Sequence, residues 1–199
     1  MRKDVRFPAE WEEQEAILMA LPHSGTDWNY ILPRALEQYH TLVKAFTGEG
    51  RHVLLMCPDK EKTTSLFTDI DASLLTLIEM DYNDTWTRDY GPLALEKHGT
   101  LRCLDFGFNG WGLKFASDKD NLVNLSLKEK FLILPEQYRN HRDFTLEGGS
   151  VESDGRGTIL TTSRCLCSPN RNGGKNKQEL NRILGERLGA DHVLWLDCR

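Results

Sequence analysis

Short apolar runs alternate with amphipathic helical patterns through the first 80 residues, and this alternation constrains the fold more than any other feature. Each run has the length of a buried strand, and two of them end at a proline, which is typical of strand ends. The longer stretch between them, 32–46, carries apolar residues three and four positions apart, the spacing of a helix with one buried face. The order is therefore β, α, β, α, β, and the expected fold class is α/β. The strands are 16–21, 52–57 and 74–80, and the helices are 32–46 and 60–67, the second capped by Asp59.

The rest of the chain predicts hairpins, each followed by a helix and a further strand. The hairpins turn at His98-Gly99 and at Asp154-Gly155. Strands plus a helix recur roughly every 60 to 70 residues, which indicates repeated modules. The expected strands are 93–96, 101–106, 144–147, 150–153, 157–162 and 192–196, and the expected helices are 120–131 and 177–188.

The segment Asp81–Pro92 directly follows the third predicted strand. It combines three acids, one arginine and three aromatic residues with a closing Gly-Pro. In α/β proteins, sites form where strands end. Carboxylates hold a planar guanidinium through paired hydrogen bonds, and an indole offers it a π face. The segment is therefore predicted to bind a guanidinium.

This segment has two other interpretations. A strand that ends in Asp, Asn and Gly-Pro is often only a turn, in which Arg88 pairs with an acid. A calcium loop of the EF-hand type starting at Asp81 needs Gly at its sixth position and Glu at its twelfth, where this chain has Trp86 and Pro92. The calcium loop is excluded, whereas the turn stays an alternative.

Four motifs in a fixed order resemble one protein family. N-D-x-W-x-R-D-x-G-P, here Asn83–Pro92, is similar to the signature of agmatine deiminases and the bacterial peptidylarginine deiminases grouped with them. The other motifs are Phe7–Glu12, Leu146–Ser150 with its E-G-G-S, and Thr161–Asn172, which ends in N-R-N. The resemblance spans the whole chain and implies a pentein fold, an α/β-propeller of ββαβ modules. It implies one pentein-type catalytic domain over residues 1–199, with about three of five modules, incomplete at the C-terminus.

The resemblance also assigns roles to residues of these motifs. Asp89 would be the catalytic carboxylate that holds the substrate guanidinium, with Trp86 packed beside it. Glu147 would be a second catalytic acid, in contact with substrate. Trp28 would wall the substrate pocket, with a packing residue before the next helix as an equal alternative. Loop-shaping roles are expected for Asn83, Asp84 and Arg88.

The implied reaction converts agmatine and water to N-carbamoylputrescine and ammonia, a step toward putrescine. A thiolate attacks the guanidinium carbon to give a thiouronium intermediate, and a His moves protons as ammonia leaves and water attacks. In the family, that His lies in a G-H-x-D segment and the Cys in a glycine-rich run, both beyond the last residue of this sequence. No nucleophile is therefore assigned to any of the five cysteines, and the chain alone is expected to be inactive. The residues that lack the family's context are Cys165, Cys167, Cys198 and His192.

Two alternatives to agmatine hydrolysis stay open. The first is peptidylarginine deimination, which citrullinates proteins, because the groups that would read the far end of the substrate cannot be placed. The second is a non-catalytic guanidinium-binding or assembly fragment. The uncovered module edges of such a fragment would favour aggregation or dimerisation.

Composition excludes several functional classes. Hydrophobic content of 39% with 28% charged residues is ordinary for a soluble globular protein. A net charge of −5 argues against a general nucleic-acid binder and suits a cationic substrate. No apolar run has the length of a signal peptide core or a membrane span, and an odd number of cysteines fits reduced thiols. A cytoplasmic location is expected.

No metal and no cofactor are expected. The Cys165–Cys167 pair has no second Cys or His pair nearby to complete a zinc site. The glycine-rich loop Gly107–Gly112 lacks the spacing of a dinucleotide-binding fingerprint. The expected partner is a small guanidino substrate, with neither nucleic acid nor membrane, and a homo-oligomer is left open.

Overall fold

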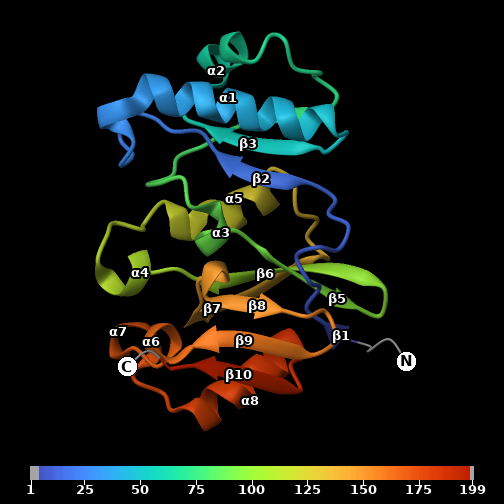
Figure 1. The fold of residues 1–199 in the computed structure, drawn as a ribbon, viewed down its shortest axis with the longest axis vertical. Coiled ribbons are helices and arrows are strands. Elements are labelled where there is room, and N and C mark those ends of the chain that lie inside the picture. Colours follow the sequence, from blue (N-terminus) through green and yellow to red (C-terminus); the bar gives the residue numbers. More distant parts are fainter. Residues whose placement is uncertain (1–4, 198–199) are drawn as a thin grey trace. The chain divides into compact units, whose positions relative to one another are not determined.

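The computed structural model describes residues 5–197, which form a mixed α/β fold with three sheets (Figure 1). The chain divides into two compact units. The first unit contains the N-terminal stretch through Glu12, Arg88–Ser117 and the chain from Asn121 onward. The second unit contains Glu13–Thr87 and the short segment Asp118–Asp120. The boundary at Thr87 falls within a short helix, α3 (Thr87–Tyr90).

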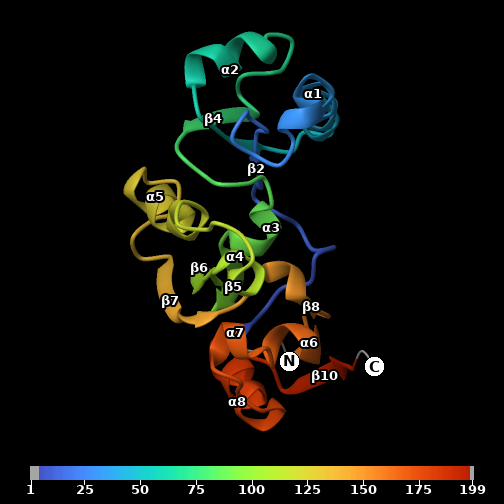
Figure 2. The ribbon, with the colours of Figure 1, turned by 90° about the vertical axis from the view of Figure 1, so that its left-hand side faces the viewer.

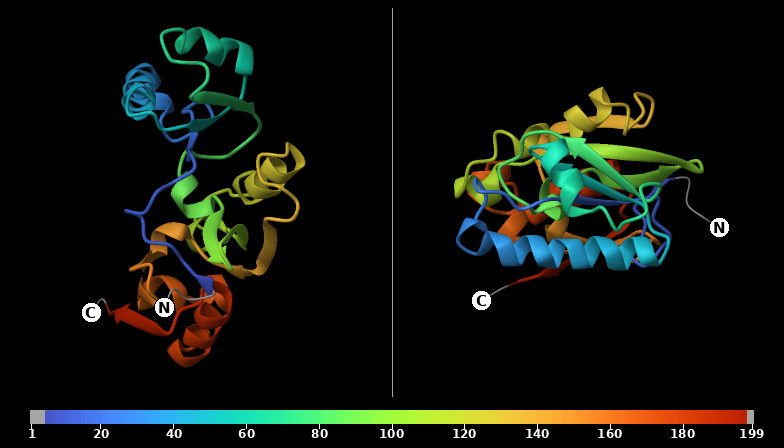
Figure 3. Two further views of the ribbon diagram at one scale, coloured as in Figure 1. Left: turned by 90° about the vertical axis from the view of Figure 1, so that its right-hand side faces the viewer. Right: turned by 90° about the horizontal axis from the view of Figure 1, so that it is seen from above.

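The second unit is built on a parallel sheet of three strands in the order β2–β3–β4. The helices α1 (Leu32–Gly48) and α2 (Lys60–Leu66) lie together on one side of that sheet (Figures 1 and 3). The predicted order β, α, β, α, β is confirmed. The elements are β2 (Ile17–Ala20), η1 (Asn29–Ile31), α1 (Leu32–Gly48), β3 (Val53–Cys57), α2 (Lys60–Leu66) and β4 (Leu75–Glu79).

The core of the second unit is built on alternate side chains of β3. Val53, Leu55 and Cys57 are fully buried on one face of the strand, and they pack in one cluster with Val43 of α1. Successive side chains of a strand point to opposite faces, so every second residue reaches the helices. The Asp59 side chain accepts a hydrogen bond from the Lys62 backbone N–H and so caps α2 as expected.

The first unit contains two sheets with the same local plan. In each, an antiparallel pair is followed by a helix and by a strand parallel to the second strand: β5–β6, α5 and β7, then β8–β9, α8 and β10. This is the expected ββαβ plan, whereas the sheet of the second unit is parallel throughout. The sheet orders are β1–β5–β6–β7 and β10–β9–β8. The strands are β1 (Val5–Arg6), β5 (Leu93–Lys97), β6 (Thr100–Gly107), β7 (Tyr138–Thr145), β8 (Val151–Ser153), β9 (Thr158–Thr162) and β10 (His192–Leu196).

The helix α8 (Lys177–Leu188) anchors the last sheet and lies beside β10 (Figure 2). Its N-terminus carries a capping box, in which Asn176 and Glu179 bond each other's backbone N–H groups. Its buried face joins the main core of the unit. The α8 residues in that core are Leu180, Ile183, Leu184 and Leu188.

Other predicted elements differ from the structure at their ends. The helix expected over 120–131 is a short turn η2 (Asp120–Leu122) followed by α5 (Val123–Glu129). The strand expected from residue 144 begins earlier, as β7 at Tyr138. Six short helical elements were not predicted: η1, α3, α4 (Gly110–Leu113), η3 (Gly148–Ser150), α6 (Ser163–Leu166) and α7 (Pro169–Asn172).

Candidate functional site

Asp89 lies in α3 with its carboxylate held from two sides within the first unit. One oxygen, Oδ2, accepts a hydrogen bond of 2.9 Å from the Trp111 indole Nε1. The other, Oδ1, accepts one of 3.1 Å from the backbone N–H of Gly149. Asp89 is half-buried. The two donors fix the orientation of the carboxylate without neutralising its charge.

Arg88 turns to a different partner. Its guanidinium forms an ion pair with Glu10, and both side chains are about half exposed. No Lys, Arg or His between residues 5 and 197 forms an ion pair with Asp89. Arg88 therefore pairs with an acid, as the turn alternative expected, but that acid is Glu10 and not Asp89. The turn stays an alternative, while the Asp89 carboxylate is left to neutral donors.

The glycines of E-G-G-S explain how the two motifs meet. A Cβ placed on Gly149 would lie 2.4 Å from Asp89 Oδ1, and one on Gly148 would lie 2.3 Å from the Arg88 carbonyl oxygen. Real Cβ atoms do not approach other heavy atoms so closely, so only glycine fits at either position. The absence of side chains here therefore admits the Arg88 carbonyl at Gly148 and the Asp89 carboxylate at Gly149.

Glu147 is buried and forms an ion pair with Arg171 inside the first unit. Its two carboxylate oxygens accept from Arg171 Nε at 2.8 Å and 2.9 Å. The side chains are 3% and 10% exposed, so this pair is largely removed from water. A buried carboxylate needs such a partner, since an isolated buried charge is very unfavourable. Sequence reasoning did not identify Arg171, although it lies in the N-R-N motif that carried the resemblance.

The two asparagines of N-R-N fix the segment around Arg171. Asn172 donates to the Thr145 carbonyl and accepts from the Thr145 N–H, both at 2.9 Å. The Asn170 carbonyl accepts from Asn109 Nδ2 at 2.7 Å. The motif therefore joins the end of β7 to the glycine-rich loop.

The glycine-rich loop presents Trp111 to Asp89. Trp111 has a left-handed backbone with φ of 57°, and Gly110 before it has φ of 64°. A Cβ on Gly110 would lie 2.1 Å from the Phe115 carbonyl oxygen, so this turn requires glycine there. The Trp111 ring meets Phe108 and Phe115 edge to face, at centroid distances of 5.0 and 5.6 Å. Sequence reasoning considered this loop only for nucleotide binding and missed the role of Trp111.

In the second unit, Trp28 and Trp86 lie together. Their ring centroids are 6.4 Å apart, and the rings are tilted by 36°. The Trp28 indole Nε1 donates to Thr85 Oγ1 at 2.8 Å. Trp86 is 49% exposed, which is a large fraction for an indole and leaves much of the ring open to a ligand.

The four predicted site residues thus fall into two pairs. Asp89 and Glu147 are in the first unit, linked to each other through the Gly148–Gly149 backbone, and Trp28 and Trp86 are in the second. Along the chain, Trp86 precedes α3 and Asp89 lies within it.

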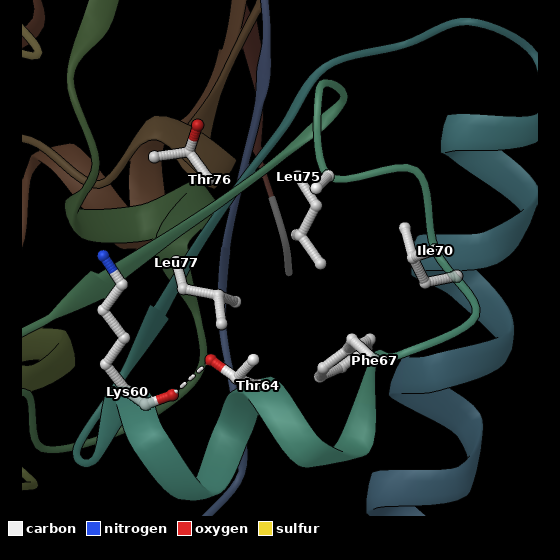
Figure 4. A pocket seen from close by; sticks show the side chains of 8 residues that line it. Lys60, Thr64, Phe67, Ile70, Leu75, Thr76 and Leu77 are labelled. Atoms are coloured by element: carbon white, nitrogen blue, oxygen red, sulfur yellow. Dashed lines mark hydrogen bonds between the residues drawn. The ribbon is translucent and has the colours of Figure 1, made fainter.

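Two surface hollows lie elsewhere and contain none of these four residues. An apolar hollow of about 330 Å³ in the second unit opens between α2 and β4, where Phe67, Leu75 and Leu77 point into it (Figure 4). A polar hollow of about 580 Å³ in the first unit is lined by Arg6, Trp11, Glu12 and the Asp154–Arg156 turn.

The described cysteines and His192 are spread over several elements of the fold. Residues 5–197 contain no group of three or more His, Cys, Asp or Glu side chains placed to hold a metal ion. None of Cys57, Cys103, Cys165 and Cys167 forms a disulfide, and Cys198 lies outside the described residues. His192 is exposed at the start of β10. None of the helices within 5–197 is long and apolar enough to cross a bilayer.

The chain matches known proteins over nearly its whole length. Residues 6–198 match the family described as Porphyromonas-type peptidyl-arginine deiminase. The agmatine deiminase of Pseudomonas aeruginosa (strain UCBPP-PA14) is 32% identical over 197 residues, which cover 96% of this chain and 52% of that protein. The chain thus spans about half the length of the curated relatives it matches.

Two solved structures have the same fold. The substrate-bound agmatine deiminase of C. jejuni gives a TM-score of 0.89 at 38% identity, covering 97% of this chain and 56% of that one. The agmatine deiminase of Enterococcus faecalis gives a TM-score of 0.81 at 31% identity, covering 98% of this chain and 53% of that one.

Proposed function

The chain belongs to the family of Porphyromonas-type peptidyl-arginine deiminases, and on that premise we propose that it forms part of an amidine hydrolase whose substrate is agmatine. The reaction consumes agmatine and water and yields N-carbamoylputrescine and ammonia. The family supports the reaction class, and the agmatine deiminases among the relatives support the substrate.

The observation that carries this proposal is the hydrogen bonding of the Asp89 carboxylate. Each of its oxygens accepts one neutral donor, from Trp111 and from Gly149. An ionised carboxylate offers about four lone-pair positions, so each oxygen can accept one further N–H. Two parallel N–H groups are what a guanidinium presents, and a charge-assisted pair of this kind is the strongest that a carboxylate makes.

We assign Trp86 and Trp28 to the walls of the substrate site and Glu147 to the second acid. The exposed ring of Trp86 suits a delocalised cation. Glu147 keeps lone pairs beyond those used by Arg171 Nε, so its carboxylate can accept another donor. Its contact with substrate stays a prediction.

The covalent step needs groups that the resemblance locates beyond residue 199. A Cys thiolate would add to the guanidinium carbon, and ammonia would leave with a proton supplied by a His. Water would then add to the thiouronium carbon as the C–S bond breaks, which gives the ureido product and regenerates the thiolate. We therefore propose that residues 1–199 bind substrate but do not turn it over. We also propose that the three sheets correspond to three of five pentein modules.

Calorimetric titration of the chain with agmatine tests the proposal. We expect saturable binding that Asp89→Asn weakens by roughly 10- to 100-fold, the range for losing a hydrogen bond to a charged group. The matched control is Asp143→Asn, which removes another carboxylate of the same unit that pairs with Arg187 at the surface. Asp143→Asn should bind agmatine like the natural chain.

The same titration distinguishes the alternative substrate. The matching family is described by its action on peptidyl-arginine, so an arginine-containing peptide is the direct comparison. Tighter binding of the peptide than of agmatine would favour peptidylarginine deimination. Equal agmatine affinity of the natural chain and Asp89→Asn would remove Asp89 from the site, and ammonia release by the chain alone would contradict its proposed inactivity.

A further inference from the structure

The segment Asp118–Asp120 belongs to the second unit, although the chain on both sides of it belongs to the first. Within the second unit it meets the loop that precedes Trp86. The two pieces of chain are about 36 residues apart in sequence and bond each other in both directions.

Asp120 supplies the acceptor for that loop. Its Oδ1 accepts from the backbone N–H of Asn83 at 2.6 Å and from that of Asp84 at 3.3 Å. The residue is fully buried, with 0% of its surface exposed. Its other oxygen, Oδ2, has no hydrogen-bond partner among the described residues.

Asn83 forms the reciprocal hydrogen bonds to the segment Asp118–Asp120. Its Oδ1 accepts from the backbone N–H groups of Lys119 and Asp120, at 2.8 and 3.1 Å. Its Nδ2 donates to Asp118 Oδ1 at 3.1 Å. Each segment therefore satisfies the backbone donors of the other through a side chain, which fixes their relative position more tightly than a single hydrogen bond would.

From this contact a hydrogen-bonded path leads to the indole pair. Asp84 Oδ1 accepts from the Thr85 backbone N–H at 2.7 Å, and Thr85 Oγ1 accepts from Trp28 Nε1 at 2.8 Å. Trp86 is the next residue and lies against Trp28. The loop that Asp120 holds is thus the loop that orients both rings.

We propose that Asp120 is a positioning residue that fixes the Trp28–Trp86 pair by holding the backbone of Asn83 and Asp84. All the residues of this contact and both rings belong to the second unit. Its consequence for substrate affinity rests on the proposed function, in which these two rings contact the guanidino compound.

The burial of the Asp120 carboxylate indicates that this residue does more than stabilise the fold. Burial raises the pKa of Asp120 to about 6, since desolvation disfavours the charged carboxylate. The nearby Asp84 and Asp118 act in the same direction, and the two backbone N–H groups act against it. A neutral asparagine would keep an acceptor without burying a charge. The charge is instead what strengthens the two hydrogen bonds to the loop.

The test uses the chain labelled with fluorotryptophan and followed by fluorine NMR and amide hydrogen exchange. Trp28→Phe and Trp86→Phe assign the two resonances of the second unit, and Trp11, Trp111 and Trp195 of the first unit serve as internal references. In Asp120→Ala, we expect the Trp28 and Trp86 resonances to shift or broaden while the three references stay. We expect exchange protection of the Asn83 and Asp84 amides to fall by roughly tenfold or more.

Two further variants define the cause. Asp120→Asn keeps the shape and one acceptor but not the charge. It should therefore restore the two resonances only to their low-pH positions in the natural chain, and protection at pH 8 should stay severalfold below the natural level. Asp69→Ala removes an exposed carboxylate of the same unit that pairs with His40 and Lys44. It should change neither the resonances nor the exchange.

Lowering the pH provides an independent test. Protonation of Asp120 near pH 6 should weaken its hydrogen bonds to the backbone N–H groups of Asn83 and Asp84. The Trp86 resonance should therefore titrate near that pH in the natural chain but not in Asp120→Asn. The titratable groups facing Asp120 are Asp84, Asp118 and Tyr82, and His23 lies against the Tyr82 ring. These groups remain in Asp120→Asn, so a titration that persists in that variant belongs to them and overturns this part of the inference.

Other outcomes are equally decisive. Unchanged Trp28 and Trp86 resonances in folded Asp120→Ala would overturn the proposal. If Asp120→Ala does not fold, natural protection of the Asn83 and Asp84 amides in Asp120→Asn would overturn it instead. Failure of the proposed function is distinct, because then the natural chain would not bind agmatine while the resonance changes in the variants remained.

Discussion

At the scale of single residues, Asp120 shows a conflict between stability and placement. Its carboxylate is fully buried with one oxygen unpartnered in the described chain, and its pKa is raised to about 6 from an ordinary value of 3.8. The folded state therefore binds this proton more tightly than the unfolded state does. Between about pH 4 and pH 6 the free energy of unfolding should fall as the pH rises, because charging the buried group becomes progressively unfavourable.

Asp120→Asn removes that charge, so it should be more stable than the natural chain above pH 6. The rise in the Asp120 pKa corresponds to about 3 kcal/mol, which is an upper figure for the gain. The difference should shrink toward pH 4, where the natural carboxyl is protonated in the folded state. Urea unfolding of both chains from pH 4 to pH 8 measures it. A variant less stable than the natural chain at pH 8 would show that the ionised form is the favourable one in the fold.

At the scale of elements, close backbone approach connects the E-G-G-S turn to α3. Gly149→Ala would place a methyl group 2.4 Å from Asp89 Oδ1 and would displace the N–H that holds it. Overpacking of this kind typically costs about 1–3 kcal/mol, so we expect lower stability and weaker agmatine binding together.

Gly48→Ala is the matched control for this substitution. Gly48 ends α1, and a Cβ added there would meet nothing within 4 Å. Alanine favours helix over glycine by about 1 kcal/mol, so this variant should be neutral or stabilising. Thermal unfolding of the two variants compares them, and equal tolerance of both alanines would mean that the α3 contact is readily displaced.

Elements with a local signal could be predicted from the sequence, and those that depend on distant partners could not. The helix at Lys177–Leu188 and the strand at His192–Leu196 match the predicted ranges, because periodicity and flanking Gly residues mark them locally. The first part of β7 reads Tyr-Arg-Asn-His-Arg-Asp, which has no apolar alternation. It becomes a strand only through its parallel pairing with β6.

In the candidate site, too, local motifs could be recognised from the sequence, whereas distant partners could not. The types of residue were readable from the Asn83–Pro92 and Leu146–Ser150 motifs. Their partners were not, since Trp111 lies 22 residues from Asp89 and Arg171 lies 24 from Glu147. Only tertiary packing brings these side chains together. The one available signal for Arg171 was its position in a motif that carried no assigned role.

At the scale of the whole molecule, the strand β10 combines a free sheet edge with exposed leucines. It is an edge strand of the β10–β9–β8 sheet, and its backbone pairs with β9 on one side only within the described residues. Leu194 and Leu196 on it are 55% and 53% exposed. An edge strand with exposed apolar side chains is a template for pairing with another chain.

We therefore expect the chain to self-associate through β10 in a concentration-dependent manner. Replacing Leu194 and Leu196 by Lys should yield a monomer, because like charges on an edge strand repel a second copy. Leu66→Lys, at a site on α2 that is 45% exposed, adds one of these positive charges elsewhere and should leave association unchanged. Light scattering across a dilution series measures the mass. A natural chain that stays monomeric at every concentration would show that the exposed leucines are too few to drive pairing, and dissociation by Leu66→Lys as well would point to net charge rather than to the β10 edge.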